Sequence, residues 1–177
     1  MLIRINTSLL KVILPLLLLL PLSSSCRDSE GGSSPERRLD NSFNSAESLT
    51  EKFLSALRDG DLETMEKIAA DREEFESLLW PHLPASKPGT NLTSDFVWKQ
   101  SQIQSLAGLR ETINRFKETD IELVRVELSG EIRDYGELRL FMEPEVVVST
   151  EGNERKVQLF GALMMLDGEY KIYSYSL

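Results

Sequence analysis

The hydrophobic pattern of this chain changes its period once, at Thr119. Upstream, from about residue 46, apolar residues recur every three or four positions, as they do along one side of an amphipathic helix. Downstream the period is two, which is typical of strands, and Asp167-Gly168 between two such runs predicts a tight β-hairpin. Helices followed by an antiparallel meander predict an α+β fold with the helices packed on one face of the sheet.

Capping residues and helix breakers indicate where the helices begin and end. The sequence Ser48-Leu-Thr-Glu51 has the capping-box pattern and predicts the start of the first helix, and Gly60 predicts its end. Asp61 is the expected cap of a second short helix, and Pro81 is expected to end a third. The acids of these helices are expected on solvated faces, and they include Glu63, Glu66, Glu73 and Glu74.

A longer helical pattern covers residues 96–116. Gly108 interrupts this pattern and indicates a bend. After the helix, a phase slip between residues 121 and 128 predicts a β-bulge in the first strand. The helix is expected to turn one apolar stripe toward the core, formed by Ile103, Leu106, Leu109, Ile113 and Phe116.

Two segments resemble a known superfamily. FLSALRDGDLETMEKIAA, residues 53–70, resembles the opening helices of the nuclear transport factor 2-like superfamily, and GEYKIYSYSL, residues 168–177, is similar to its final strand. The resemblance implies that residues 46–177 form a cone, in which a strongly curved antiparallel sheet closes on the N-terminal helices, as in cystatin-like folds. The loop after Pro81 and the helix at 96–116 are longer than the minimal fold of that superfamily requires.

The first 25 residues are typical of an export signal. The apolar run Val12–Leu22 has eleven residues and contains Pro15 and Pro21. A helix that crosses a bilayer needs about 20 apolar residues, and proline inside a helix removes a hydrogen bond. Basic residues precede the run and small serines follow it, in the order of a secretory signal.

The only cysteine, Cys26, directly follows Ser23–Ser25. This order resembles a bacterial lipoprotein signal, in which the cysteine receives diacylglycerol before cleavage, although Ser23 stands where the usual leucine does. The resemblance implies a lipid anchor on Cys26 and a place in the bacterial cell envelope, and Arg27 favours the outer membrane by analogy with enteric bacteria. The alternative is a soluble secreted protein that is cut elsewhere.

These features divide the chain into three parts. Residues 1–25 are expected to be the signal peptide and residues 45–177 the α+β domain. Between them, residues 26–44 are expected to form the lipidated cysteine and a flexible tether, because glycine, serine, proline and charged residues dominate there.

Composition excludes several classes of partner and site. Beyond Cys26 the chain has no cysteine, so the domain has no internal disulfide and no thiolate metal site. The chain has 20 basic and 29 acidic residues, and removal of residues 1–25 would leave 18 basic residues and a net charge of −11. Phosphate backbones repel such a chain, so nucleic acid is not an expected partner.

Candidate catalytic residues are few. His82 is the only histidine, and it lies in the proline-rich loop Trp80–Asp95 without a recognisable orienting partner. Motifs of serine hydrolases, P-loop proteins and zinc proteases are absent from the sequence. A non-catalytic domain that binds a ligand or a protein, without cofactor or metal, is therefore expected. The alternative is a small-molecule isomerase or dehydratase of the same superfamily, which would need an acid or a histidine inside the cone.

The last two strands are apolar on both faces, and alternation places Phe160, Ala162 and Met164 together on one of them. Helices on one face would leave the other uncovered. The expected cover is a second copy of the chain, an envelope protein, an apolar small ligand or the chain's own loop Trp80–Asp95. The candidate pocket or interface residues are Trp98, Phe160, Met164, Tyr170, Ile172, Tyr173 and Tyr175.

Overall fold

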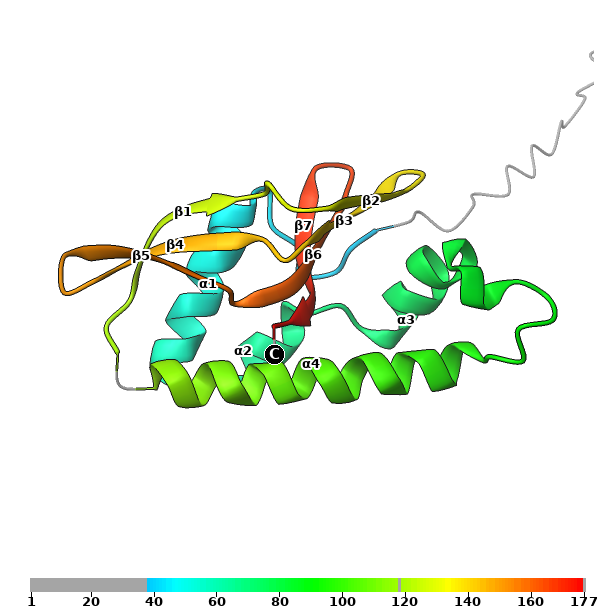
Figure 1. The fold of residues 1–177 in the computed structure, drawn as a ribbon, viewed down its shortest axis with the longest axis horizontal. Coiled ribbons are helices and arrows are strands. Elements are labelled where there is room, and N and C mark those ends of the chain that lie inside the picture. Colours follow the sequence, from blue (N-terminus) through cyan, green and yellow to red (C-terminus); the bar gives the residue numbers. More distant parts are fainter. Residues whose placement is uncertain (1–37, 118, 177) are drawn as a thin grey trace, which may run out of the picture. The chain divides into compact units, whose positions relative to one another are not determined.

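The computed structural model describes residues 38–117 and 119–176. Helices fill the first half of this part and antiparallel strands fill the second, so the α+β class is confirmed (Figure 1). The helical segments are α1 Ala46–Asp59, α2 Leu62–Lys67, α3 Arg72–Glu74, a π-helical turn Phe75–Leu79, two 3-10 turns Trp80–His82 and Pro84–Ser86, and α4 Ser94–Phe116. The strands are β1 Glu122–Glu127, β2 Ile132–Tyr135, β3 Leu138–Met142, β4 Glu145–Thr150, β5 Asn153–Val157, β6 Phe160–Leu166 and β7 Glu169–Tyr175.

The strands form two antiparallel sheets, with the orders β1-β4-β5 and β2-β3-β6-β7. The chain bends sharply from β3 into β4 at Glu143, whose φ is 48°, and it passes from β5 into β6 within two residues. Pairing continues around the bend: the Met142 N–H donates to the Glu131 carbonyl at 2.9 Å, and the Glu143 N–H donates to the Gly161 carbonyl at 2.8 Å. Bent strands therefore run through both sheets.

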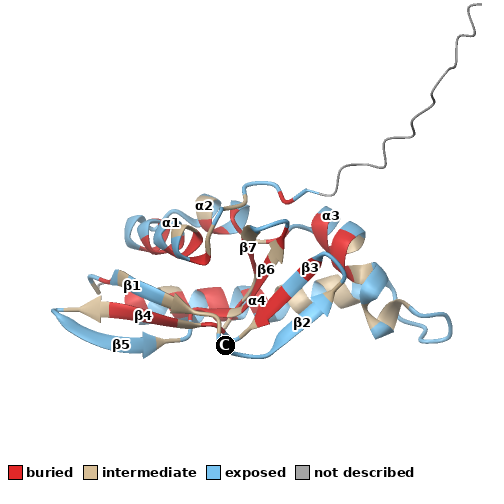
Figure 2. Ribbon diagram, turned by 90° about the horizontal axis from the view of Figure 1, so that it is seen from above, coloured by how far each residue is buried: buried red, intermediate tan, exposed pale blue. Residues whose placement is uncertain are grey.

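Helical segments cover both faces of the β2-β3-β6-β7 sheet, so the expectation of helices on one face is wrong. One core lies against α1, α2 and α4, and the other lies against the segment from α3 to the first 3-10 turn. In Figure 2, β4 and β6 are mostly buried, whereas β5 is exposed. The first core contains Phe53, Met65, Val146, Phe160, Leu163 and Ile172. The second core contains Leu39, Phe75, Leu79, Leu140, Met164 and Leu166.

A bulge in β6 separates residues that alternation placed on one face. Phe160 pairs with Tyr175, but the register shifts on both sides of Ala162. As a consequence Phe160 lies in the first core and Met164 lies in the second, so the expected shared face of these two residues is wrong. Gly161 is the residue that could have indicated this shift, because glycine within a strand often marks a bulge. A Cβ at this position would lie 2.8 Å from the Ser174 hydroxyl oxygen.

Local signals were interpreted correctly at several turns. Gly60 has a φ of 67° and ends α1, and Asp61 caps α2 by accepting from the Thr64 N–H at 3.0 Å. Asp167 and Gly168, with φ of 52° and 83°, connect β6 to β7 as a two-residue turn. The expected bulge in β1 is confirmed by a register shift between residues 123 and 125.

Two helix predictions are wrong. α1 begins earlier than expected, because Ser45 is its N-cap and accepts a hydrogen bond from the Ser48 N–H at 3.0 Å. Along α4, Ile103 and Leu106 are exposed by 63% and 39%, so the apolar stripe does not face the core along its whole length. Glycine at position 108 lets α4 pack closely against the end of β7, because a Cβ there would lie 2.2 Å from the Ser176 carbonyl oxygen.

Residues 39–43, here called the strap, belong to the folded domain rather than to a flexible tether. Leu39 is 2% exposed in the second core. Phe43 and Tyr170 exchange backbone hydrogen bonds of 2.9 and 2.6 Å, and the Ser42 hydroxyl donates to the Glu169 carboxylate at 2.6 Å. The ordered domain therefore begins upstream of residue 45, whereas the remainder of the expected tether, residues 26–37, lies outside the described residues.

Candidate functional site

The residues expected to form a pocket or an interface lie in the two cores. Ile172 and Tyr175 are buried in the first core, with Tyr170 half-buried beside them. Trp98 and Tyr173 are half-buried against the second core. The chain itself covers the second face of the sheet, chiefly with side chains of the segment that precedes the loop Trp80–Asp95: Phe75, Leu78 and Leu79.

The two C-terminal tyrosines are polar groups within this packing. The Tyr175 hydroxyl donates to the Met65 carbonyl at 2.7 Å, and burial raises the pKa of this phenol strongly. Burial also raises the pKa of Tyr173, whose hydroxyl lies 3.5 Å from the hydroxyl of Ser101. Both phenols are therefore protonated at neutral pH and serve as hydrogen-bonding groups.

His82 is exposed on the first 3-10 turn, with its ring centroid 6.3 Å from that of Tyr135. Among the described residues it has no hydrogen bond and no ion pair, so no neighbouring group orients its ring for proton transfer. Cys26 lies outside the described residues.

A buried ion pair was not predicted from the sequence. Glu74, expected on a solvated face, is 6% exposed, and Lys171 is 1% exposed. The Lys171 ammonium lies 2.7 Å from both carboxylate oxygens, and the same carboxylate accepts from the backbone N–H groups of Asp40 and Asp71, each at 2.9 Å. The carboxylate thus connects the strap, the start of α3 and β7. Two signals were present: the spacing of Asp71 and Glu74, and a lysine within an apolar strand.

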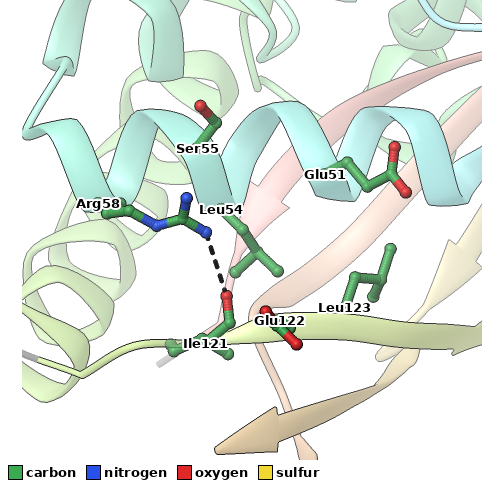
Figure 3. A pocket seen from close by; sticks show the side chains of 7 residues that line it. All are labelled: Glu51, Leu54, Ser55, Arg58, Ile121, Glu122 and Leu123. Carbon is green, nitrogen blue, oxygen red and sulfur yellow. Dashed lines mark hydrogen bonds between the residues drawn. The ribbon is translucent and has the colours of Figure 1, made fainter.

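One concave site formed by the described residues is a groove between α1 and β1, and it combines an apolar floor with a charged rim. It has a volume of about 290 Å³. Leu54 and Ile121 are each 5% exposed and form its floor with the half-buried Leu123. Figure 3 shows the helix and the strand side by side, with these side chains between them.

Helical spacing places the polar rim of the groove on one side of α1. Glu51, Ser55 and Arg58 are three or four residues apart and exposed, so they follow the same edge of the helix. The capping-box prediction assigned Glu51 to the first turn. It instead lies in the second turn, because the helix begins at Ala46, and there it faces the groove.

The rim is predominantly acidic. Glu51 and Glu122 form no ion pair with any described residue. Arg58 is already engaged, because its guanidinium donates to the Ile121 carbonyl at 3.5 Å and lies 4.0 Å from the Asp120 carboxylate. The groove therefore presents an apolar floor, two unpaired carboxylates and one cation that the chain itself holds.

β1 forms the edge of its sheet at this groove. It pairs with β4 on one side, and the described residues give no backbone hydrogen bond to its other side. The groove is thus bounded by a helix on one side and by a strand edge without backbone pairing on the other, where the Ile121 carbonyl accepts from the Arg58 guanidinium. The sequence indicated the apolar residues of β1, but not the helix that lies beside them.

Comparisons with protein-family models, with curated proteins and with solved structures give no match to this chain. Among the described residues, no helix is long and apolar enough to cross a membrane. No group of three or more metal-ligating side chains is found in the same part of the chain.

Proposed function

We propose that this chain is a lipid-anchored protein of the bacterial envelope, whose domain binds a partner rather than catalysing a reaction. The observation that carries the proposal is the order of basic residues, apolar run and serines before a single cysteine, Cys26. Eleven residues separate Cys26 from Arg38, where the described part begins. Even fully extended, they and the bonds at either end span at most roughly 40 Å, so an anchored domain works close to the membrane.

For the fold, we propose the nuclear transport factor 2-like cone. Its support is the helix, Asp59-Gly60-Asp61 turn and helix at the start of the domain, together with sheets whose strands bend around a core that includes α1. The extended α4 is the main departure from the minimal form of that fold.

Among the partners expected from the sequence, the groove supports an envelope protein. A second copy, an envelope protein and an apolar ligand were each expected as the cover of the two-faced strands, and the chain covers those faces itself. By contrast, the open strand edge beside an apolar floor has no cover from the described residues.

The alternative of an isomerase or dehydratase is less well supported. Such an enzyme needs an acid or a histidine that can reach a bound substrate. Glu74 is the buried acid among the described residues, and it is held by one ammonium and two backbone N–H groups.

The lipid anchor is tested by growing a bacterium that expresses the chain with labelled palmitate. We expect label in the wild-type protein and in Ser24→Ala, which retains the cysteine, and none in Cys26→Ala. Equal labelling of wild type and Cys26→Ala would show that Cys26 is not the lipid attachment site.

A further inference from the structure

We infer that the groove between α1 and β1 binds an extended peptide of a partner protein, which adds to the β1 edge as a further strand. The peptide would place an aliphatic side chain on the groove floor, with lysine or arginine next to it in sequence. This inference rests on the proposed binding function and names the partner chemistry of the site.

The strand edge provides the first argument. An unpaired edge presents a row of N–H and C=O groups, and extended peptides bind to such edges through main-chain hydrogen bonds. The outer edge of β7 is closed to this mode, because Phe43 and the segment from Ile68 to Ala70 pair with it. The outer edge of β1 has no such pairing among the described residues, and α1 forms the second wall of a channel beside it.

Size and apolar lining provide the second argument. Sites for whole drug-sized ligands have volumes of roughly 300–1,000 Å³. The groove, at about 290 Å³, is just below that range and is open to solvent. It therefore suits one or two aliphatic side chains of a peptide, whose backbone stays outside against β1. Leu54, Ile121 and Leu123 supply the contact surface for those side chains.

Charge provides the third argument. Glu51 lies on the α1 side of the groove and Glu122 on the β1 side, and neither has a partner among the described residues. Arg58 also lines the groove, but its contacts are to the Ile121 carbonyl at 3.5 Å and the Asp120 carboxylate at 4.0 Å, and one cation against two carboxylates leaves the rim negative. Side chains of an extended peptide alternate between opposite directions. Because Glu122 lies between Ile121 and Leu123 in the sequence, a basic residue next to the buried one would point to the face on which Glu122 lies.

The bulge in β1 limits the length of the added strand. The register shifts between Leu123 and Arg125, and beyond it Arg125 and Glu127 join an exposed charge network with Lys156. Bulges and charged side chains discourage pairing at an edge. The Ile121 carbonyl already accepts from the Arg58 guanidinium at 3.5 Å, so the peptide would pair near Glu122 and Leu123 alone, and we expect a short recognition sequence.

A matched pair of variants isolates the groove. Ser55→Trp places a large side chain in the groove, and Ser55 is exposed, so the substitution is compatible with folding. Lys52→Trp adds the same side chain to an exposed position of α1 that does not line the groove. The full chain, in lipid nanodiscs, would be used to select binders from a phage-displayed library of random nonapeptides.

We expect selected peptides that combine aliphatic and basic residues, and that bind Ser55→Trp at least tenfold more weakly than wild type. Binding to Lys52→Trp should change less than twofold. Methylation of alternate peptide amides should weaken binding at least tenfold if it removes the strand hydrogen bonds, and bound peptide should slow amide exchange at Glu122 and Leu123. Glu122→Gln should reduce the preference for basic peptides.

Three outcomes would overturn the inference. Enriched peptides that bind wild type and Ser55→Trp equally would place the binding site elsewhere, while the binding function of the domain would stand. Peptides that tolerate methylation of either set of amides would show that no strand is added. Failure to enrich any peptide above background would remove the peptide-binding site itself, and the palmitate experiment would still report independently on the lipid anchor.

Discussion

The outer edge of β7 pairs with other segments of the chain, whereas the outer edge of β1 has no backbone pairing with any described segment. Along β7, the Phe43 and Tyr170 backbones pair, the Ala70 N–H donates to the Ile172 carbonyl at 2.7 Å, and the Ile172 N–H donates to the Ile68 carbonyl at 3.1 Å. Along β1, the described residues offer no backbone partner on the outer side.

The difference lies in what flanks each edge. Next to β7 the strap buries Leu39 and the Glu74 carboxylate, so that pairing and core packing reinforce each other. Next to β1 lies a groove with acids on its rim. An open edge is an association hazard unless it is protected or used. The outer edge of β7 is thus paired and packed, whereas the outer edge of β1 has no backbone pairing among the described residues, and we place the proposed peptide site there.

The strongest test of the paired β7 edge is Lys171→Ala. It leaves the Glu74 carboxylate buried without its cation, and breaking a buried ion pair from one side typically costs about 3–5 kcal/mol. The free energy of unfolding of the full chain in detergent should fall by that amount in urea titrations. Trp80 and Trp98 are suitable reporters, since their ring centroids lie 6.2 and 5.3 Å from that of Phe75 in the second core.

The double variant Glu74→Gln with Lys171→Met is the control for this prediction. It removes both charges but keeps an acceptor oxygen for the backbone N–H groups of Asp40 and Asp71, so it should recover part of the lost stability. A loss below about 1 kcal/mol in Lys171→Ala would contradict the role assigned to the pair.

Leu39→Ala should have the next largest effect. Truncation of a buried leucine usually costs about 2–5 kcal/mol, and we expect the lower part of that range because the strap can separate locally. Amide exchange at Phe43 and Tyr170 should accelerate together with the loss of stability. Unchanged exchange at these two amides would mean that the strap is held to β7 without its leucine anchor.

Tyr175→Phe should have an intermediate effect. It leaves the buried Met65 carbonyl without its donor at 2.7 Å, which costs about 1–2 kcal/mol. The wild-type protein should also lose stability as the pH rises above about 10, because a tyrosine in the unfolded chain ionises there while burial keeps Tyr175 protonated.

The variant should therefore have a flatter stability profile above pH 10 than the wild type, measured by urea titration at each pH. Identical profiles would show that Tyr175 is not the titrating group. Tyr173→Phe is the comparison variant: burial also raises the pKa of Tyr173, so this variant should flatten the profile too, but it should cost less stability at neutral pH because the hydroxyl contact with Ser101, at 3.5 Å, is longer.

Features that depend on neighbouring residues could be predicted from the sequence, whereas features that depend on distant residues could not. Local features were predictable, since Gly60, Asp61 and the Asp167-Gly168 turn need only their neighbours. Glu74 and Lys171 are 97 residues apart, and nothing near either residue identifies the other. Leu39 likewise lies in a polar segment, and nothing in that segment indicates that its side chain enters a core.

The groove depends on tertiary arrangement in the same way. The pattern showed Leu54 as part of a helix and Ile121 as part of a strand, but the channel exists because α1 lies beside the β1 edge. The misplacement of Met164 has a different cause. One bulge at Gly161 reverses the faces of every later residue in β6, so a small local irregularity changed the assignment of a whole strand.

The smallest effect is expected at the open edge. Val124 lies at the β1 bulge and is 41% exposed, so Val124→Thr preserves the shape of the side chain and changes only polarity at the surface. Surface substitutions of this kind usually alter the free energy of unfolding by less than about 0.5 kcal/mol. The matched change Ile172→Thr, at a fully buried position of β7, introduces a hydroxyl into the first core and should cost several times more. Similar losses for the two variants, measured side by side in urea, would mean that β1 is as deeply integrated as β7 and would remove the distinction on which the proposed peptide site depends.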